Sequence, residues 1–197
     1  MTRLFDPSKP QALLEHCPIH QATPLHHHGD LMLKAEASRM ELNAFKALGG
    51  VYAVAELLGG DPEALASGRA GAGATFVCAS AGNHGMAVAA GARLFGAAAR
   101  IHLSDQVAES FADRLRDKGA DVVRSGADYE ASVAAAMADA EASGATHLAD
   151  GSWPGYTEPP RLVMEGYTVI ARELMGQFDR YPERVYLQAG VGGLAAA

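Results

Sequence analysis

Between residues 60 and 150, short apolar runs alternate with longer segments of helical period, at a spacing of about twenty residues. The helical segments stop at Gly96, Gly119 and Gly144, and glycine is the residue that most often ends a helix. Strands that alternate with helices in this way form parallel sheets, because a parallel pair needs a crossover connection. The sequence therefore predicts an α/β fold with a doubly wound parallel sheet and helices on both faces.

Four strands and three helices are predicted in this region. The strands are 75–79, 99–103, 121–124 and 146–150, and the helices are 83–95, 108–118 and 129–142. The run at 75–79 is continuously apolar, which predicts a strand buried on both faces. Outside the region we predict an irregular arm over 1–24, a strand at 31–35, helices at 43–58 and 161–178, and a last strand at 184–188.

The pattern also predicts the domain organisation. We assign 60–155 to a smaller inserted α/β domain, and 1–59 and 156–197 to a larger domain. The last predicted strand runs into a glycine-rich turn, and a strand at such a place needs neighbours with which to pair. We therefore expect the chain to be the N-terminal half of a longer protein, cut at this turn.

Charge and composition argue against two classes of partner. The formal net charge is −7 and no stretch is rich in Lys and Arg, which argues against nucleic-acid binding. No apolar run approaches a membrane span, and the N-terminus lacks the apolar segment of a signal peptide. Of the two cysteines, Cys17 and Cys78, the second lies in an apolar run, which favours a free thiol and a cytoplasmic protein.

Lys46 is the first candidate for chemistry. It falls in the first turn of the predicted helix 43–58, whose residues are apolar almost all round. Burial and the positive end of the helix dipole both favour the neutral amine, which is the nucleophilic form of lysine. From this segment alone, a surface lysine whose stem packs on the helix is the simpler interpretation.

Two glycine-containing turns are candidate anion sites. The first, SAGNHG at 80–85, joins a predicted strand to a helix, where backbone N–H groups and the side chains of Asn83 and His84 can bind an anion. A plain turn capped by Asn83 is the alternative. The second, GVGGL at 190–194, is typical of phosphate binding; with Ala195 it also matches a dinucleotide pattern, which leaves a nicotinamide cofactor as an alternative.

Other polar and aromatic residues carry weaker signals. The consecutive side chains of His26, His27 and His28 cannot all face one ion, so we predict no metal site there. Asp150 ends a predicted strand and either takes part in chemistry or caps the turn that follows. In that turn, Trp153 and Tyr156 form either a packed hinge or a pocket wall.

Taken together, five motifs in order resemble the tryptophan-synthase-β-like family, also called the fold type II pyridoxal-phosphate enzymes. The resemblance covers roughly residues 10–197 and is closest to the diaminopropionate ammonia-lyase branch, with the serine/threonine dehydratases next. The motifs are LNAFKALGG at 42–50, SAGNHGMAVA at 80–89, DGSWPGYTEPP at 150–160, MEGY at 164–167 and YLQAGVGGLA at 186–195. The first is the most specific, and the five in order change the interpretation of Lys46 from a surface residue to the lysine that carries the cofactor.

The resemblance implies roles for the residues at matching positions. Lys46 would hold pyridoxal phosphate through its aldehyde, with Phe45 near the ring and Asn83 bonded to the phenolic oxygen. Asp150 would receive the β-amino or β-hydroxyl group of the substrate. The substrate carboxylate would bind at Ser80, Ala81, Gly82, Asn83 and His84, and the cofactor phosphate at the backbone of Gly190, Val191, Gly192, Gly193 and Leu194.

The activity implied is the elimination of ammonia from a small amino acid such as 2,3-diaminopropionate, serine or threonine, by an enzyme of a commonly dimeric family. At the position of Ala81 the diaminopropionate branch has an aspartate that serves the D-isomer, so the alanine favours an L-substrate. Two alternatives are a β-replacement synthase of the same fold, such as a cysteine-synthase-like enzyme, and a catalytically silent relative.

Overall fold

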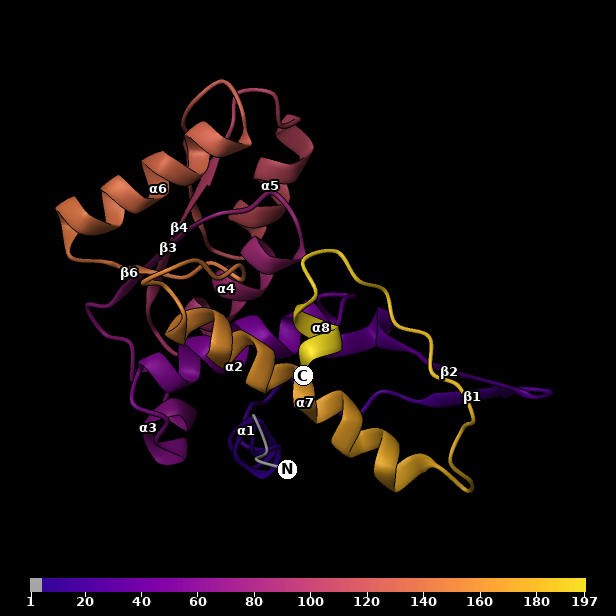
Figure 1. Cartoon of the computed structure of the whole chain (residues 1–197). Helices are drawn as coiled ribbons and strands as arrows, with labels where there is room; N and C mark the ends of the chain where they lie inside the picture. The colour runs from indigo at the N-terminus through magenta and orange to yellow at the C-terminus, as the bar shows by residue number, and fades with distance from the viewer. Residues whose placement is uncertain (1–4) are drawn as a thin grey trace.

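The computed structural model describes residues 5–197 and has a four-stranded parallel sheet in the order β5-β4-β3-β6. The strands are β3 (Thr75–Ala79), β4 (Ala98–Leu103), β5 (Asp121–Arg124) and β6 (Thr146–His147). Three helices connect them, namely α4 (Asn83–Leu94), α5 (Glu109–Asp117) and α6 (Tyr129–Ser143). Figure 1 shows α6 on one side of the sheet and α4 and α5 on the other, which confirms the predicted doubly wound α/β fold.

Strand β3 is buried on both faces, as its continuous apolar run predicts. Phe76 and Cys78 belong to the main core, whereas Val77 and Ala79 pack with Ala136 of α6. Successive side chains of a strand point to opposite faces, so a strand between two helical layers needs apolar residues at every position.

Helix α2 (Lys46–Leu57) packs between α4 and α7 (Glu158–Gln177). Two adjacent glycines allow this close approach. A Cβ atom on Gly50 would lie 2.5 Å from the Cβ of Ala87 on α4, and one on Gly49 would lie 2.5 Å from Cε1 of Tyr167 on α7. The three helices therefore touch at distances that only glycine permits.

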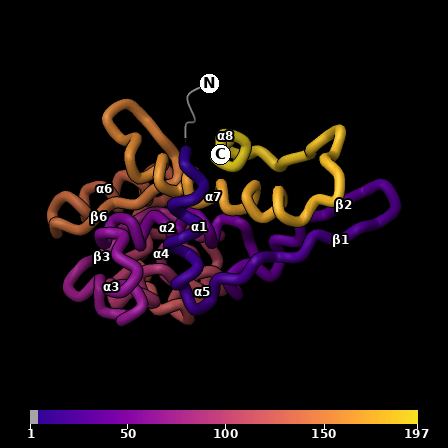
Figure 2. The backbone as a smooth tube through the Cα atoms, turned by 90° about the horizontal axis from the view of Figure 1, so that it is seen from below, coloured from indigo at the N-terminus to yellow at the C-terminus, as the bar shows by residue number. Residues whose placement is uncertain are grey.

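The N-terminal region differs from the predicted irregular arm. Residues 1–4 of that arm lie outside the described residues, whereas α1 (Ser8–Leu14) is a helix that buries Leu13 and Leu14 against α2 and α7. In Figure 2 the three helices lie side by side. The strand β1 (Leu25–His28) pairs antiparallel with β2 (Leu31–Lys34), and the hairpin projects from the body in Figure 1.

The predicted strand at 184–188 is wrong. Residues 178–192 follow an irregular path to the short helix α8 (Gly193–Ala196), and Val185, Tyr186 and Leu187 are exposed. An apolar run becomes a strand only where another strand supplies its hydrogen bonds, and no strand of the described chain pairs with this one. Strand β6 is likewise shorter than predicted, because its ladder with β3 pairs only Thr146 and His147.

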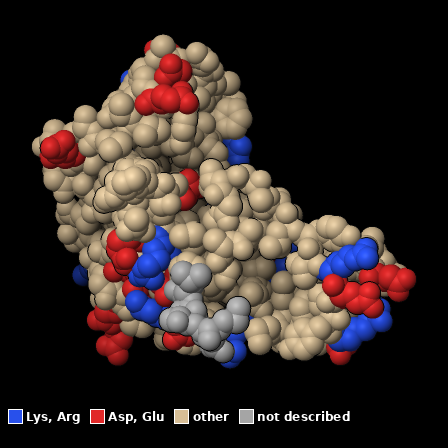
Figure 3. Space-filling model, viewed as in Figure 1, with Lys and Arg blue, Asp and Glu red and all other residues tan. Residues whose placement is uncertain are grey.

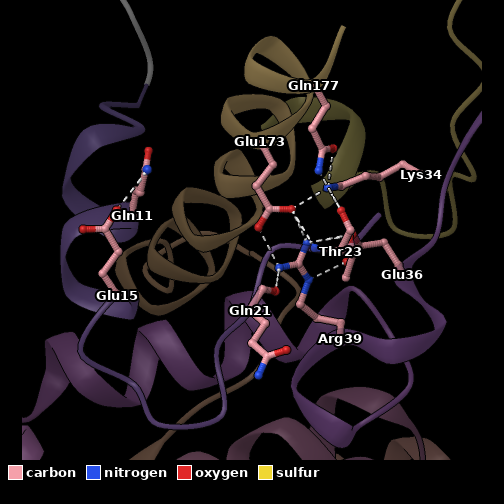
Figure 4. A network of polar contacts seen from close by, with 9 residues as sticks. All are labelled: Gln11, Glu15, Gln21, Thr23, Lys34, Glu36, Arg39, Glu173 and Gln177. Atoms are coloured by element: carbon pink, nitrogen blue, oxygen red, sulfur yellow. Dashed lines mark hydrogen bonds and ion pairs between the residues drawn. The ribbon is translucent and has the colours of Figure 1, made fainter. Parts of the chain in front are cut away.

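A buried ionic network attaches the hairpin to α7 (Figure 4). Arg39, in the 3-10 helix η1 (Glu36–Glu41), is fully buried and bonds to Glu36 and to both carboxylate oxygens of Glu173 at 2.7 Å. Lys34 adds a bond of 2.5 Å to Glu173 and one of 2.9 Å to Gln177. Two cations and two carboxylates balance one another, which offsets the cost of removing them from water.

The segment that leads from this network to Lys46 has an unusual backbone. Met40, Glu41 and Asn43 have φ angles of 49°, 56° and 60°. Left-handed conformations cost non-glycine residues roughly 1–2 kcal/mol each and persist only where neighbouring contacts impose them. The buried Arg39 and Met40 supply such contacts, so tertiary packing sets the position at which α2 begins.

The surface charges and the apolar core relate to the predictions about nucleic-acid binding, membrane crossing and domain division. On the face shown in Figure 3, the Lys and Arg side chains lie beside Asp and Glu rather than in a continuous positive patch. In the described part of the chain, no helix combines the length and apolarity that crossing a membrane requires. One cluster of buried apolar residues extends from Leu13 to Ile170, and the division into domains at 59 and 155 stays a prediction.

Candidate active site

A pocket of about 300 Å³ lies where the start of α2, the end of the β6 strand region and the glycine turn meet. Segments that are distant in the chain meet here because α2 is held between α4 and α7. Eight of the residues singled out in the sequence line the pocket, together with Tyr167 and Gln188. The eight are Phe45, Lys46, Asp150, Gly190, Val191, Gly192, Gly193 and Leu194.

Lys46 and Asp150 form an ion pair in this pocket. The lysine Nζ donates to Oδ2 of Asp150 at 2.5 Å, with 30% of the lysine side chain and 22% of the aspartate side chain exposed. The sequence placed Asp150 at a strand end with no cation beside it, whereas the fold supplies one. Lys46 is accordingly a partly buried lysine with a carboxylate partner, rather than a lone desolvated amine.

The electrostatic surroundings keep Asp150 ionised. Burial by itself would raise the pKa of the Asp150 carboxyl, but positive charge on His84 and the hydrogen bond and charge of Lys46 together hold that pKa below its ordinary value. Burial lowers the pKa of His84, so its ring carries that positive charge only in acid, and at neutral pH Lys46 is the cation that acts on Asp150. The pocket thus holds a carboxylate and an amine that share one hydrogen bond.

The glycine turn gives the pocket a wall of backbone. A Cβ atom on Gly190 or Gly192 would meet nothing within 4 Å, and Gly192 has a φ of +88°, which favours glycine. Gly193 is the first residue of α8, and a Cβ atom on it would lie 3.5 Å from Cγ of Met164 and 3.6 Å from Cε2 of Tyr167. A turn of this kind presents N–H groups without side chains, which suits an anionic ligand.

The segment Ser80–His84 does not line this pocket. Gly82 and Asn83 are exposed at the start of α4, and Ser80 and Ala81 are half-buried. His84 is 3% exposed and points into the core, where Nε2 lies 2.9 Å from the carbonyl oxygen of Leu148. His84 therefore helps to hold the strand end that carries Asp150, and the role of this segment in substrate binding stays a prediction.

The aromatic residues after Asp150 form a packed loop rather than a wall of the pocket. The rings of Trp153 and Tyr156 stack at a centroid distance of 4.1 Å and an angle of 10°. The Tyr156 hydroxyl donates to the carbonyl of His147 and accepts from the N–H of Ala149, both at 2.9 Å. These bonds fasten the backbone immediately before Asp150, so Tyr156 positions the carboxylate without facing the pocket.

Two pocket residues were assigned no role from the sequence. Tyr167 is 4% exposed and packs edge-on against Phe45 at a centroid distance of 5.2 Å. It ends the MEGY motif, and it falls on the buried face of α7 with Val163 and Ile170, a helical spacing that could have marked it. Gln188 lies two residues before Gly190 of the glycine turn, and no periodicity distinguishes it.

The histidine run shows no arrangement for a metal ion. His26, His27 and His28 form strand β1, where they are exposed and pair with β2. Among the residues that the structure describes, no group of three or more His, Cys, Asp or Glu side chains is placed to hold a metal. Cys17 and Cys78 are both buried free thiols.

Residues 14–197 match the model of a protein family described as pyridoxal-phosphate dependent enzyme. The chain is 34% identical to a diaminopropionate ammonia-lyase of Escherichia coli strain K12, over 84% of this chain and 44% of that protein. It is 31% identical to a probable D-serine dehydratase of Rhizobium etli strain CIAT 652, over 84% of this chain and 41% of that protein.

The fold is also similar to that of a solved structure. The diaminopropionate ammonia-lyase of Escherichia coli, in complex with an aminoacrylate–PLP azomethine reaction intermediate, superposes with a TM-score of 0.87 and 33% identity. The superposition covers 98% of this chain and 55% of that one. The chain thus spans about half the length of the relatives it matches.

Proposed function

The chain belongs to the family of pyridoxal-phosphate dependent enzymes, and from this premise we propose a specific elimination reaction. The substrate is a small amino acid with an amino or hydroxyl group on its β-carbon, and the products are a 2-oxo acid and ammonia. The observation that carries the proposal is the bond of 2.5 Å between Lys46 and Asp150, in a pocket that the glycine turn completes. Similarity to a diaminopropionate ammonia-lyase and to a probable D-serine dehydratase supports elimination as the reaction class.

The chemical groups that line the pocket fit those of pyridoxal phosphate. It offers one amine, at Lys46, to an aldehyde, and an open backbone turn at 190–194 to a phosphate. Tyr167 also lines the pocket, and its hydroxyl is buried without a partner among the described residues. When bound, the cofactor supplies an electron sink that stabilises negative charge on the substrate α-carbon. Lys46 would hold its aldehyde, residues 190–194 its phosphate, and Phe45 would flank its ring.

The ion pair of Lys46 and Asp150 supplies the groups that an elimination needs for binding the substrate and transferring protons. Asp150 is a carboxylate at neutral pH, so it can bind a cationic β-amino group or accept a hydrogen bond from a β-hydroxyl group in place of Lys46. The amine of Lys46, once released, is a base beside the substrate, and in its protonated form it can donate a proton to a departing amine. The bonds of Tyr156 and His84 keep the backbone around Asp150 fixed while this happens.

The test is a product assay with the purified protein. Both enantiomers of 2,3-diaminopropionate and of serine, and L-threonine, are each incubated with the holoenzyme, and 2-oxo acid and ammonia are measured. Elimination releases one 2-oxo acid for each serine or threonine consumed, and Lys46→Ala releases none. Formation of a new amino acid when sulfide is added, without 2-oxo acid, would instead identify a β-replacement synthase. Failure of every substrate with a protein that binds the cofactor would refute the proposal.

A further inference from the structure

Tyr167 carries a hydroxyl group that has no protein partner in the part of the chain that the structure describes. The residue is 4% exposed and its Oη makes no hydrogen bond. Buried hydroxyls are normally bonded, because removing one from water without a partner is unfavourable. Tyr167 also lines the pocket of Lys46 and Asp150, but its Oη is not itself exposed there. A ligand in that pocket therefore becomes its partner only if the adjoining glycine turn moves on binding.

The ring of Tyr167 is held from three sides, which limits where its hydroxyl lies. Cε1 is 2.5 Å from the position that a Cβ on Gly49 would take, and Cε2 is 3.6 Å from the corresponding position on Gly193. Phe45 packs against the ring edge-on. Oη is attached to the carbon between Cε1 and Cε2, so it lies between the first turn of α2 and the glycine turn.

We propose that Tyr167 donates a hydrogen bond to the phosphate of the cofactor, and this rests on the proposed function, which places that phosphate at residues 190–194. The hydroxyl and the backbone N–H groups of the turn would then bind the same anion from two sides. Asp150 is the other anionic group of the pocket, but its carboxylate is bonded to Lys46 and makes no bond to Tyr167.

The protonation state of Tyr167 agrees with this role. Burial and, to a smaller extent, the negative charge of Asp150 raise the pKa of the Tyr167 phenol far above its ordinary value. The phenol is therefore protonated throughout the physiological range, and its O–H group is a donor suited to an anionic acceptor.

The experiment compares pyridoxal phosphate with pyridoxal, which lacks the phosphate, as ligands of the apoenzyme. Dissociation constants are measured by absorbance titration for the wild type and for Tyr167→Phe, which keeps the ring and its packing. We expect Tyr167→Phe to weaken pyridoxal phosphate by about ten-fold or more, the effect of losing one hydrogen bond to a charged group. Binding of pyridoxal should stay unchanged.

A second readout separates ligand binding from a structural role. The melting temperature of the apoenzyme should be unchanged or higher in Tyr167→Phe, because the variant removes an unpaired buried hydroxyl. Tyr181→Phe removes the same atom from a residue that is 73% exposed and outside the pocket, and it should leave both affinities at the wild-type values. Equal weakening of both ligands by Tyr167→Phe, or no weakening of either, would overturn the proposal.

A third variant tests the phosphate site independently of Tyr167. Gly192→Ala places a side chain at a φ of +88° in the turn, and it should reduce the preference for pyridoxal phosphate over pyridoxal. If that preference stays at the wild-type value in Gly192→Ala, the phosphate does not bind at this turn and the proposed cofactor placement fails. If Gly192→Ala loses the preference and Tyr167→Phe keeps it, only the inference about Tyr167 fails.

Discussion

Nζ of Lys46 lies 2.5 Å from Oδ2 of Asp150, although 104 positions separate the two residues in the chain. The lysine stands at the first residue of α2, and the aspartate follows β6 at the edge of the sheet. Both side chains line one pocket with the glycine turn. An amine and a carboxylate in contact at a pocket wall can bind a ligand and exchange a proton with it.

Lys46 is expected to be the residue that carries the cofactor. Reduction of the holoenzyme with borohydride, followed by peptide mass spectrometry, should find the phosphopyridoxyl group on the peptide that contains Lys46. Its amine faces the pocket, whereas the amine of Lys34 is bonded to Glu173 and Gln177 in the network of Figure 4. An adduct on Lys34 or Lys118 would show the assignment to be wrong.

Asp150→Asn is expected to lower kcat/KM by about 10- to 100-fold, the usual effect of losing a hydrogen bond to a charged group. The neutral amide cannot balance a cationic β-amino group, but it has nearly the same shape, so the cofactor should still attach to Lys46. Steady-state assays of 2-oxo acid and the reduced-adduct analysis measure the two effects. Asp113→Asn, at an aspartate of α5 whose side chain is 63% exposed, is the matched control. Wild-type kcat/KM in Asp150→Asn would remove this carboxylate from the mechanism.

The enantiomer preference is expected to follow from Ala81. An alanine side chain has no group that removes a proton, so we expect turnover of an L-amino acid and little turnover of D-2,3-diaminopropionate. Rates of 2-oxo acid formation from the two enantiomers measure the preference, and D-serine is tested as well because a probable D-serine dehydratase is among the relatives. Ala81→Asp should raise the rate with the D-isomer relative to the L-isomer. Equal rates with both enantiomers in the wild type would contradict the prediction.

Gly49→Ala is expected to destabilise the protein by about 1–3 kcal/mol, the usual cost of overfilling a packed interface. The added methyl group would lie 2.5 Å from Cε1 of Tyr167 and 2.6 Å from the carbonyl oxygen of Val163, so α2 and α7 must separate. Gly176→Ala is the matched control, because a Cβ there meets nothing within 4 Å inside a helix. The control should stabilise the protein by up to about 1 kcal/mol. Urea unfolding measures both, and equal stabilities would refute the packing argument.

The network around Glu173 is expected to make stability fall in acid. Burial would raise the pKa of this carboxyl, but hydrogen bonds from Arg39 and Lys34 outweigh burial and lower it. A pKa that is lower in the folded state means that the unfolded chain takes up the proton first. The stabilisation is therefore complete above the unfolded pKa of about 4.3 and is lost as the pH falls through the folded value.

Glu173→Gln should test this dependence directly. It leaves the buried Arg39 without one of its carboxylates, so the free energy of unfolding at neutral pH should fall by about 3–5 kcal/mol. The free energy of unfolding should also decrease less steeply as the pH falls. The free energy of unfolding in urea, measured across the acid range, gives both quantities. Glu141→Gln, at an exposed residue of α6, is the control and should keep the wild-type profile. If the free energy of unfolding of Glu173→Gln falls in acid as steeply as that of the wild type, carboxyl groups other than Glu173 cause the decrease.

Periodicity in the sequence was sufficient to predict the central sheet and its helices. The run at 75–79 and the glycines at 96, 119 and 144 predict elements whose order and type the structure confirms. Local signals suffice there because helix termination and strand burial depend on neighbouring residues and on the side-chain pattern itself. The family motifs in turn identified Lys46 and the glycine turn, which do line one pocket.

Tertiary contacts determined the conformation of residues 184–188 and the arrangement of the pocket. The apolar run at 184–188 is not a strand, because a strand needs a partner that the run itself does not contain. The pairing of Lys46 with Asp150, the inward orientation of His84 and the entry of Tyr167 into the pocket depend on helices packed at Gly49 and Gly50. Motifs can identify which residues take part in a site, but the distances between residues 104 positions apart arise only when distant segments pack together.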